Sequence, residues 1–316
     1  MSHSTRLPGL ILALTIALST AAGCSSGGSS GASGSSSSFP VAIQAANGTV
    51  TIDKRPTAIV SLSATATEML YAIGAGGQMK AVDKYSNYPK TAPITSLDGF
   101  NPNIEAIASY KPDLVVVDQD SPDFDSRFKA LGIPVLNLPT ATSLSDAYHQ
   151  YVELGAATGR VNAAENEVTQ VKSQLSQIVS SAPASARGDT YYYELDQTYY
   201  SVTSSTFIGQ ILGMLGLKNI ADKAPGASQN GGYPQLSAEF ILAAHPGYIF
   251  LADTLCCGQS LHTVEARPGW AVLPAVQHGR VLRLNDDIAS RWGPRIVDLL
   301  QAVANELRSH PVSSGG

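Results

Sequence analysis

Hydrophobic residues in this chain form short unbroken runs and longer periodic stripes, and the two alternate along most of its length. The runs 114–117 and 248–251 contain no charged residue. Such runs are typical of strands that are covered on both faces of a parallel sheet. Over 161–179, apolar residues recur at three- and four-residue spacing, which predicts one long amphipathic helix. Strand and helix signals alternate on both sides of this stripe, so an α/β fold is expected.

Two segments share one pattern. When Glu105 and Glu239 are aligned, each segment has isoleucine two residues later, proline seven residues later, and then one of the apolar runs. A helix-capping residue precedes each glutamate, either Asn101 or Asn103 in the first copy and Ser237 in the second. Each copy therefore predicts a short helix, a turn marked by proline, and a buried strand. The glutamates are 134 residues apart, far more than the period of a solenoid, so we expect two similar lobes.

Other periodic segments extend this alternation. Further strands are predicted at 50–52, 58–62, 81–83, 133–138, 190–195 and 279–284. Further helices are predicted at 65–73, 124–131, 146–158, 207–215 and 294–307. The whole pattern predicts two Rossmann-like lobes with central, mostly parallel sheets, at residues 40–142 and 184–316. A helical linker is predicted between them, at 143–183.

One acidic residue is assigned to the fold itself. Glu68 falls in the first turn of the helix predicted at 65–73. A carboxylate there interacts favourably with the positive end of the helix dipole, so a structural role is expected for Glu68.

The N-terminal segment carries export signals. Arg6 is followed by an apolar stretch at 10–18 and by small residues before Cys24, which is typical of a secretory signal peptide. The apolar stretch is shorter than the ~20 residues that a membrane span needs. Small residues before a cysteine resemble a bacterial lipobox, although Ala21 stands where that pattern prefers leucine or valine. We predict a lipoprotein signal peptide at 1–23, lipidation of Cys24, and a flexible Ser/Gly-rich tether at 24–39.

Composition and motifs narrow the function classes. The 316 residues carry a net charge of −5 without any basic cluster, which argues against a nucleic-acid partner. No phosphate loop, H-E-x-x-H or nucleophile elbow occurs, and this disfavours a hydrolytic enzyme. A binder of bare Zn²⁺ or Mn²⁺ would need several converging His and carboxylate ligands, and the six histidines are scattered without such spacing.

The remaining cysteines, Cys256 and Cys257, are adjacent. A disulfide between them and a pair of free thiols both remain open. They do not form the C-x-x-C motif of a redox enzyme, and two ligands alone rarely hold a structural metal.

Several short motifs occur in a particular order along the chain. They are 61–63 with Thr67 and Glu68, 85–89, 103–105, 111–115, 233–237 with Glu239, and 290–295. In this order they resemble the iron-complex and cobalamin-binding proteins of ABC importers, whose two lobes are joined by one long helix. The resemblance covers about 49–307. It implies a binding protein that needs no resident metal or cofactor of its own.

The resemblance assigns the two repeated glutamates to a partner. Glu105 and Glu239 match the glutamates, one per lobe, that bind arginine pockets of the membrane permease. Pairs of carboxylate and arginine form directional, charge-assisted hydrogen bonds. The alternative is that both residues only favour helix N-termini, as acidic residues generally do.

By the same resemblance, a ligand would lie between the lobes. The residues expected to line it are mostly aromatic: Tyr85, Tyr88, Tyr199 (or Tyr200), Tyr233, Arg291 and Trp292. Tyrosine combines a flat apolar ring with one hydroxyl, which suits a large ring or metal chelate. Each aromatic residue is equally well explained as a packing residue.

The ligand class stays open between three chelates. Leu97 and Asp118 stand where cobalamin binders can carry tryptophan, which weakens the case for a corrinoid such as vitamin B12. An anionic siderophore would meet few cations, namely Arg291 and Arg295, and the latter is expected to be structural. For haem, no histidine falls in a pocket loop except His262, although tyrosine can bind iron. We rank a corrinoid first, a ferric siderophore second and haem third.

The expected protein is therefore a lipoprotein anchored at the outer face of the cytoplasmic membrane. It would capture a metal chelate and deliver it to an ABC permease and the associated ATPase. The linker helix should allow only small movements of the lobes, because bending a helix without a Pro or Gly hinge breaks backbone hydrogen bonds.

Overall fold

The computed structural model describes residues 39–119 and 122–312. The predicted signal peptide, Cys24 and all of the predicted tether except Phe39 lie outside the described residues. In the part of the chain that is described, no helix combines the length and the apolar character needed to cross a membrane.

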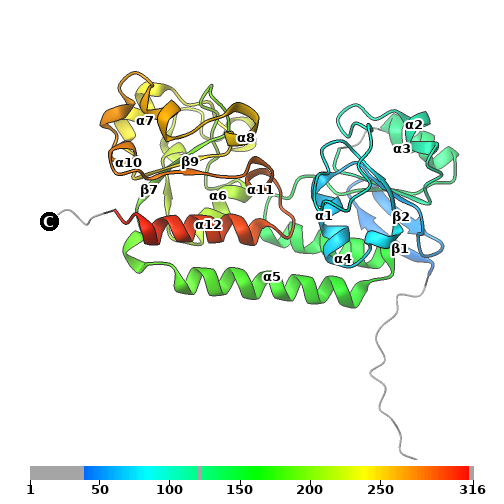
Figure 1. The fold of residues 1–316 in the computed structure, drawn as a ribbon. Helices are drawn as coiled ribbons and strands as arrows, with labels where there is room; N and C mark the ends of the chain where they lie inside the picture. Colours follow the sequence, from blue (N-terminus) through cyan, green and yellow to red (C-terminus); the bar gives the residue numbers. More distant parts are fainter. Residues whose placement is uncertain (1–38, 120–121, 313–316) are drawn as a thin grey trace, which may run out of the picture. The chain divides into compact units, whose positions relative to one another are not determined.

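Two four-stranded sheets form the centre of the fold (Figure 1). The first has the order β4-β3-β5-β6, with strands Met79–Val82, Ile59–Ser61, Leu114–Val117 and Val135–Asn137. The second has the order β10-β9-β7-β8, with strands Val281–Arg283, Tyr248–Leu251, Thr190–Glu194 and Lys218–Asn219. Every pairing within these sheets is parallel. The predicted α/β fold with mostly parallel sheets is confirmed.

The two apolar runs become central strands. β5 lies between β3 and β6, with Ile59 opposite Leu114 and Val115 opposite Val135. β9 lies between β7 and β10, with Tyr191 opposite Tyr248. All four residues of each central strand are buried. This burial explains why neither run alternates with polar residues.

A small antiparallel hairpin precedes the first sheet. It pairs β1 (Val41–Ala45) with β2 (Gly48–Ile52). The sequence predicted part of β2 and missed β1, in which only Ile43 is fully buried. Gly48 has a φ of 102°, which favours glycine in this tight turn.

Helices surround both sheets. Those that follow strands of the first sheet are α1 (Ala64–Ala72), α2 (Ile104–Ala108) and α3 (Pro122–Ala130). The longer helices of the second half are α6 (Phe207–Gly213), α7 (Ala238–Ala244) and α12 (Ile296–Ser309). Four very short helices also occur there: α8 (Thr254–Cys257), α9 (Leu261–Glu265), α10 (Pro274–Gln277) and α11 (Asp286–Ser290).

Two helices connect the sheets. α4 (Leu144–Thr158) starts with a capping box between Ser143 and Asp146 and ends at Gly159, which has a φ of 68°. α5 (Val161–Ser181) has 21 residues and is therefore about 31 Å long. Its buried stripe is the predicted one, with Ala164, Val168, Val171, Leu175 and Ile178. α5 contacts both α4 and α12, which lie next to different stretches of it on the same side in Figure 1. The lobe boundaries at 142 and 184 stay predictions.

Candidate ligand and permease sites

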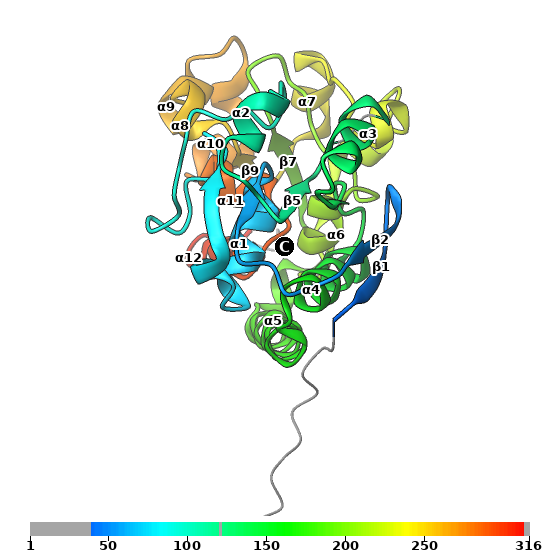
Figure 2. The ribbon, with the colours of Figure 1, turned by 90° about the vertical axis from the view of Figure 1, so that its right-hand side faces the viewer.

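The two repeated glutamates lie at matching places in the structure. Glu105 is the second residue of α2, and Glu239 is the second residue of α7. Of the two candidate caps in the first copy, Asn103 is the one used; it accepts from the main-chain N–H of Ala106 at 2.9 Å. Ser237 accepts from Phe240 N–H at 3.1 Å in the second copy. Both glutamates are exposed, and their helices lie at the same edge of the molecule in both views (Figures 1 and 2).

Their side-chain surroundings differ. Glu105 Oε1 accepts a hydrogen bond from Arg127 Nη2 on α3 at 2.7 Å. A surface cavity of about 390 Å³ adjoins this ion pair, lined by Pro102, Asn103, Ile104, Glu105, Asp123, Phe124 and Arg127. Among the described residues, Glu239 has no ion pair. Hydrogen bonds from its own main-chain N–H and from the Ser237 hydroxyl lower the pKa of Glu239.

Two of the predicted ligand residues are exposed. Tyr85 and Tyr88 lie in the loop after β4, with 40% and 44% of their surfaces accessible. The Tyr85 ring meets the edge of Phe100 with ring centres 5.1 Å apart, and Phe100 is 61% exposed. The Arg295 guanidinium lies over the Tyr88 ring at 4.4 Å. These rings form an accessible aromatic surface. No pattern in the sequence singles out Phe100, apart from its place near the predicted loops.

Tyr199 and Tyr233 are partly buried in the second half of the chain. Tyr199 stacks on Trp270 with ring centres 5.7 Å apart and has a φ of 67°. The Arg267 guanidinium lies over the same Tyr199 ring at 5.6 Å. Tyr233 packs against the main hydrophobic core, and burial raises its pKa. Both residues have packing roles, and their contact with a ligand stays a prediction.

Arg291 and Trp292 are buried and already have polar partners. The Arg291 guanidinium donates to Glu68 at 2.8 Å and to Asp287 at 2.7 Å. It also donates to Asn87 Oδ1 at 3.1 Å and to the Tyr85 carbonyl at 2.9 Å. A ligand-binding role for Arg291 gains no support from this geometry, because four hydrogen bonds already engage its two terminal nitrogens.

The polar group of Trp292 also has a partner within the protein. Its indole N–H donates to Gln150 Oε1 on α4 at 2.6 Å, and only 8% of its surface is exposed. Its ligand role likewise stays a prediction without support from these contacts.

Glu68 is the centre of a buried charge cluster. Its carboxylate accepts from Arg291 and, at 2.9 and 2.5 Å, from Arg295. Its side chain is fully buried, and the arginines lie 223 and 227 residues later in the chain. The reason given for Glu68 from the sequence was wrong, because α1 starts at Ala64 and has no acidic residue in its first turn. Glu68 is structural because it joins the first half of the chain to the second.

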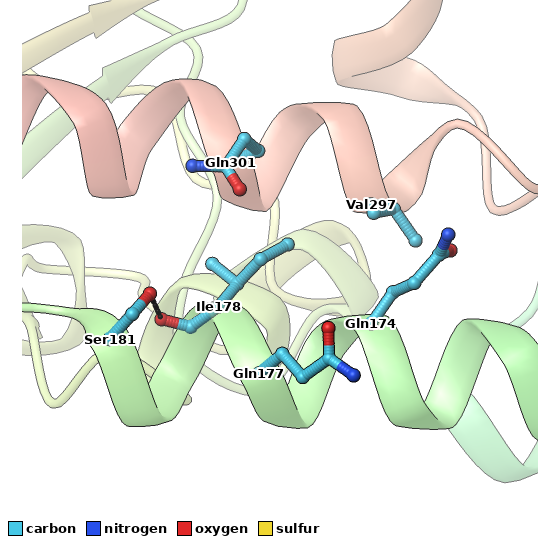
Figure 3. Close-up of a pocket in the computed structure, with 6 residues that line it drawn as sticks. All are labelled: Gln174, Gln177, Ile178, Ser181, Val297 and Gln301. Atoms are coloured by element: carbon cyan, nitrogen blue, oxygen red, sulfur yellow. Dashed lines mark hydrogen bonds between the residues drawn. The ribbon is translucent and has the colours of Figure 1, made fainter.

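A second cavity lies between α5 and α12 (Figure 3). It has a volume of about 410 Å³ and is lined by Gln174, Gln177, Ile178, Ser181, Val297 and Gln301. None of these residues is charged or aromatic. The cavity includes none of the predicted site residues, and we assign no function to it.

Cys256 and Cys257 are joined by a disulfide, which settles the alternative that the sequence left open. Both lie on the exposed helix α8. The Asp286 carboxylate accepts from the main-chain N–H groups of Thr254, Leu255 and Cys256 and holds this helix in place. In the ranges 39–119 and 122–312, no group of three or more His, Cys, Asp and Glu side chains could hold a metal ion.

Two parallel α/β lobes, a long connecting helix and one exposed glutamate at the same place in each repeat define a two-lobed solute-binding protein. Residues 59–288 match the periplasmic binding protein family, and the chain belongs to this family. It is therefore a substrate-binding transport protein and not an enzyme.

Similar proteins are found in several organisms. An uncharacterized ABC transporter substrate-binding lipoprotein of Bacillus subtilis, YvrC, is 32% identical over 85% of this chain and 86% of its own length. A cobalamin-binding protein of Halobacterium salinarum is 28% identical over 85% of this chain and 74% of its own. The structure of the periplasmic vitamin B12 binding protein BtuF of Vibrio cholerae has a TM-score of 0.63 and 24% identity. The match covers 80% of this chain and 97% of the BtuF chain. At that identity, the structural similarity shows the shared fold.

Proposed function

We propose that this protein captures a corrinoid between its lobes and delivers it to an ABC permease through Glu105 and Glu239. The observation that carries the proposal is the pair of exposed glutamates, each second in its helix, in a member of the periplasmic binding protein family. Arginine side chains of a permease are suitable partners, because carboxylate–guanidinium pairs are strong and directional.

The charges of the described residues favour a neutral, ring-shaped ligand. Arg291 is bound by Glu68 and Asp287, and Arg295 by Glu68. An anionic ferric siderophore would have to compete with these carboxylates for either cation. The exposed rings of Tyr85 and Tyr88 instead offer apolar surface and hydroxyl groups. The relatives named for cobalamin or vitamin B12 binding point to the same ligand class.

Haem is the alternative that one observation favours. The hydroxyls of Tyr85 and Tyr88 belong to exposed rings and could bind ferric iron. The propionates of haem would again meet cations that are already paired, which places haem behind a corrinoid.

The cellular setting is part of the proposal. Lipidation of Cys24 would hold the protein at the outer face of the cytoplasmic membrane, with the Ser/Gly-rich segment as a tether. The permease would work with an ATPase on the cytoplasmic side.

A fluorescence titration tests the ligand. The chain from Phe39 onward, which contains Trp270 and Trp292, is titrated with cyanocobalamin, a ferric hydroxamate siderophore and haemin. We expect saturable quenching at the lowest concentration with cyanocobalamin. We expect Tyr85→Ala with Tyr88→Ala to weaken binding at least tenfold, since each aromatic contact is worth about 1 kcal/mol. Tyr110→Ala is the matched control, because Tyr110 is 38% exposed and lies outside the predicted ligand residues. Tighter binding of the siderophore or haemin would replace the corrinoid.

Uptake measurements test permease binding. Glu105→Ala combined with Glu239→Ala should abolish import and leave ligand affinity nearly unchanged, because the glutamates are proposed to bind the permease and not the ligand. Glu165→Ala with Glu265→Ala makes the same change in net charge at two exposed positions and should leave import intact. Lost ligand affinity together with normal import would contradict the proposal.

A further inference from the structure

The Glu105 carboxylate already has a guanidinium partner within its own chain, whereas Glu239 has none among the described residues. Arg127 Nη2 lies 2.7 Å from Glu105 Oε1. This is the same type of bond that an arginine of the permease would make. The two glutamates are therefore equivalent in position but not in availability.

The ion pair is open to exchange. The side chains of Arg127 and Glu105 are 48% and 72% exposed. Both line the cavity of about 390 Å³ between α2 and α3, which leaves room for an incoming side chain. Asp123 lines the same cavity, and its carboxylate is a nearby acceptor for a displaced Arg127.

We propose that Arg127 is an internal competitor that holds the Glu105 carboxylate until a permease arginine displaces it. This inference rests on the proposed function, in which both glutamates bind the permease. Because Glu239 needs no such exchange, the C-terminal lobe engages the permease first and more tightly. The N-terminal lobe follows when Arg127 is released.

The expected size of the effect follows from the exposure of the pair. Exposed ion pairs change an equilibrium by about two- to fivefold, because water and salt screen them. Removing Arg127 should therefore strengthen binding of a cation at Glu105 by about two- to fivefold, and the gain should shrink at high salt.

Arg127→Gln is the test variant, and Lys129→Gln is its matched control. Both residues are exposed on α3 and both changes remove one positive charge, but Lys129 has no ion pair among the described residues. The first probe is N-acetyl-argininamide, a single guanidinium cation. Its binding is followed through the ¹³C shifts of the glutamate side-chain carboxyl groups in the chain from Phe39 onward.

In the wild-type chain, the probe should bind Glu239 about two- to fivefold more tightly than Glu105. Arg127→Gln should abolish this difference by strengthening binding at Glu105, whereas Lys129→Gln should leave the difference in place. An unchanged Glu105 response in Arg127→Gln would overturn the proposal. An equal gain in Lys129→Gln would also overturn it, because the effect would then be general charge and not the specific pair.

A second measurement separates this inference from the proposed function. Washed membranes of the source cells are titrated with the labelled soluble chain, and Glu105→Gln with Glu239→Gln defines the binding that depends on the glutamates. If this double variant binds like the wild type, the permease-binding function fails, whatever the probe shows at Glu105. If the double variant loses binding, Arg127→Gln should bind about two- to fivefold more tightly than the wild type. It should have no effect when Glu105 is already Gln, and weaker binding of Arg127→Gln would show that Arg127 itself contacts the permease and overturn the competitor role.

Discussion

The α2–β5 copy and the α7–β9 copy of the repeated unit make the same unusual turn with different side chains. Lys111 and His245, the residues before the two prolines, have φ values of 52° and 46°. Positive φ is uncommon for residues other than glycine. Its recurrence at matching places shows that the two copies share one backbone design, down to the turn that leads from the helix into the buried strand.

The side chains that anchor this turn differ. In both copies, the residue after proline donates its N–H to the neighbouring strand region, from Asp113 to Ala58 O and from Gly247 to Thr190 O, each at 2.9 Å. The first copy adds the Asp113 carboxylate, which accepts from the N–H groups of Thr57 and Ala58 and from the Thr57 hydroxyl. The second copy uses the small size of Gly247, since a Cβ atom there would lie 3.3 Å from Thr190 O.

This difference teaches which parts of the repeat belong to the fold. In each copy the central strand has to be held beside the neighbouring strand, and either the Asp113 carboxylate or the small Gly247 can serve this purpose. No such requirement explains why Glu105 has an ion pair whereas Glu239 has none in the part of the chain that the structure describes. We therefore expect the unequal environment of the glutamates to affect the proposed binding to a permease.

The largest effect is expected when the hydrogen bonds that anchor the turn in one copy are removed. Asp113→Ala removes three hydrogen bonds and should lower the free energy of unfolding by about 2–3 kcal/mol, measured by denaturant titration. Gly247→Ala should cost about 1 kcal/mol, because the added methyl group crowds Thr190 O and, at 3.2 Å, Val312 Cγ2. The exposed Asp53→Ala should stay within about 0.5 kcal/mol of the wild type. Equal losses for Asp113→Ala and Asp53→Ala would show that the carboxylate is no anchor.

A smaller effect is expected from the buried carboxyl groups that lie just after the two central strands. Asp118 directly follows β5, and Asp253 is the second residue after β9; burial raises the pKa of both carboxyl groups. Asp253 is fully buried, and among the described residues neither of its carboxylate oxygens has a side-chain or main-chain partner. Burial and the charge of Glu194 raise its pKa to about 7. The folded state thus holds a proton that the unfolded state releases near pH 4. Asp253 therefore makes the wild type lose stability as pH rises from about 4 to beyond 7.

Asp253→Asn removes this titration. The wild type should lose about 2 kcal/mol more stability than Asp253→Asn between about pH 5.5 and about pH 8, measured by unfolding at each pH. Asp53→Asn should follow the wild-type profile, since Asp53 is exposed. Parallel profiles for the wild type and Asp253→Asn would show that Asp253 titrates normally.

The smallest effect tests the shared turn itself. Lys111→Gly and His245→Gly should each raise the free energy of unfolding by a few tenths of a kcal/mol. Glycine removes the ~1 kcal/mol strain of positive φ but costs part of that gain in chain entropy. Ser109→Gly, at a residue with a φ of −61°, should destabilise instead. A gain in one copy and a loss in the other would contradict a common backbone design.

The regular part of the fold was predictable from the sequence. The strands at 114–117 and 248–251 occur as predicted, and α5 extends only two residues beyond its predicted end. These segments have long or unbroken apolar patterns that report burial directly. The helices α8 to α11 were missed because four or five residues form barely one turn and give no periodicity. β1 was missed because only one of its residues is fully buried.

The candidate site was predictable in position and not in its contacts. The sequence placed Glu105 and Glu239 at matching helix starts through their caps and prolines. It could not predict that Arg291 is bound by Glu68, because their contact spans 223 residues. Nor could it show that Arg127 pairs with Glu105, which depends on how α3 packs beside α2. Contacts between elements follow from the tertiary arrangement, which local patterns do not encode.

The corner between α4 and α5 has a mechanical consequence. Arg55 and Gln78 both donate to Thr158 O at this corner, and Arg160 donates to Gln78. These bonds tie the start of α5 to residues that flank strands of the first sheet, whereas α12 contacts α5 near its C-terminal end. A torque applied to α2 against α7 would be resisted by the bending stiffness of α5 and by the Glu68–Arg291 contact. We therefore expect a force applied to one repeat to be transmitted to α5 and to the Glu68–Arg291 contact.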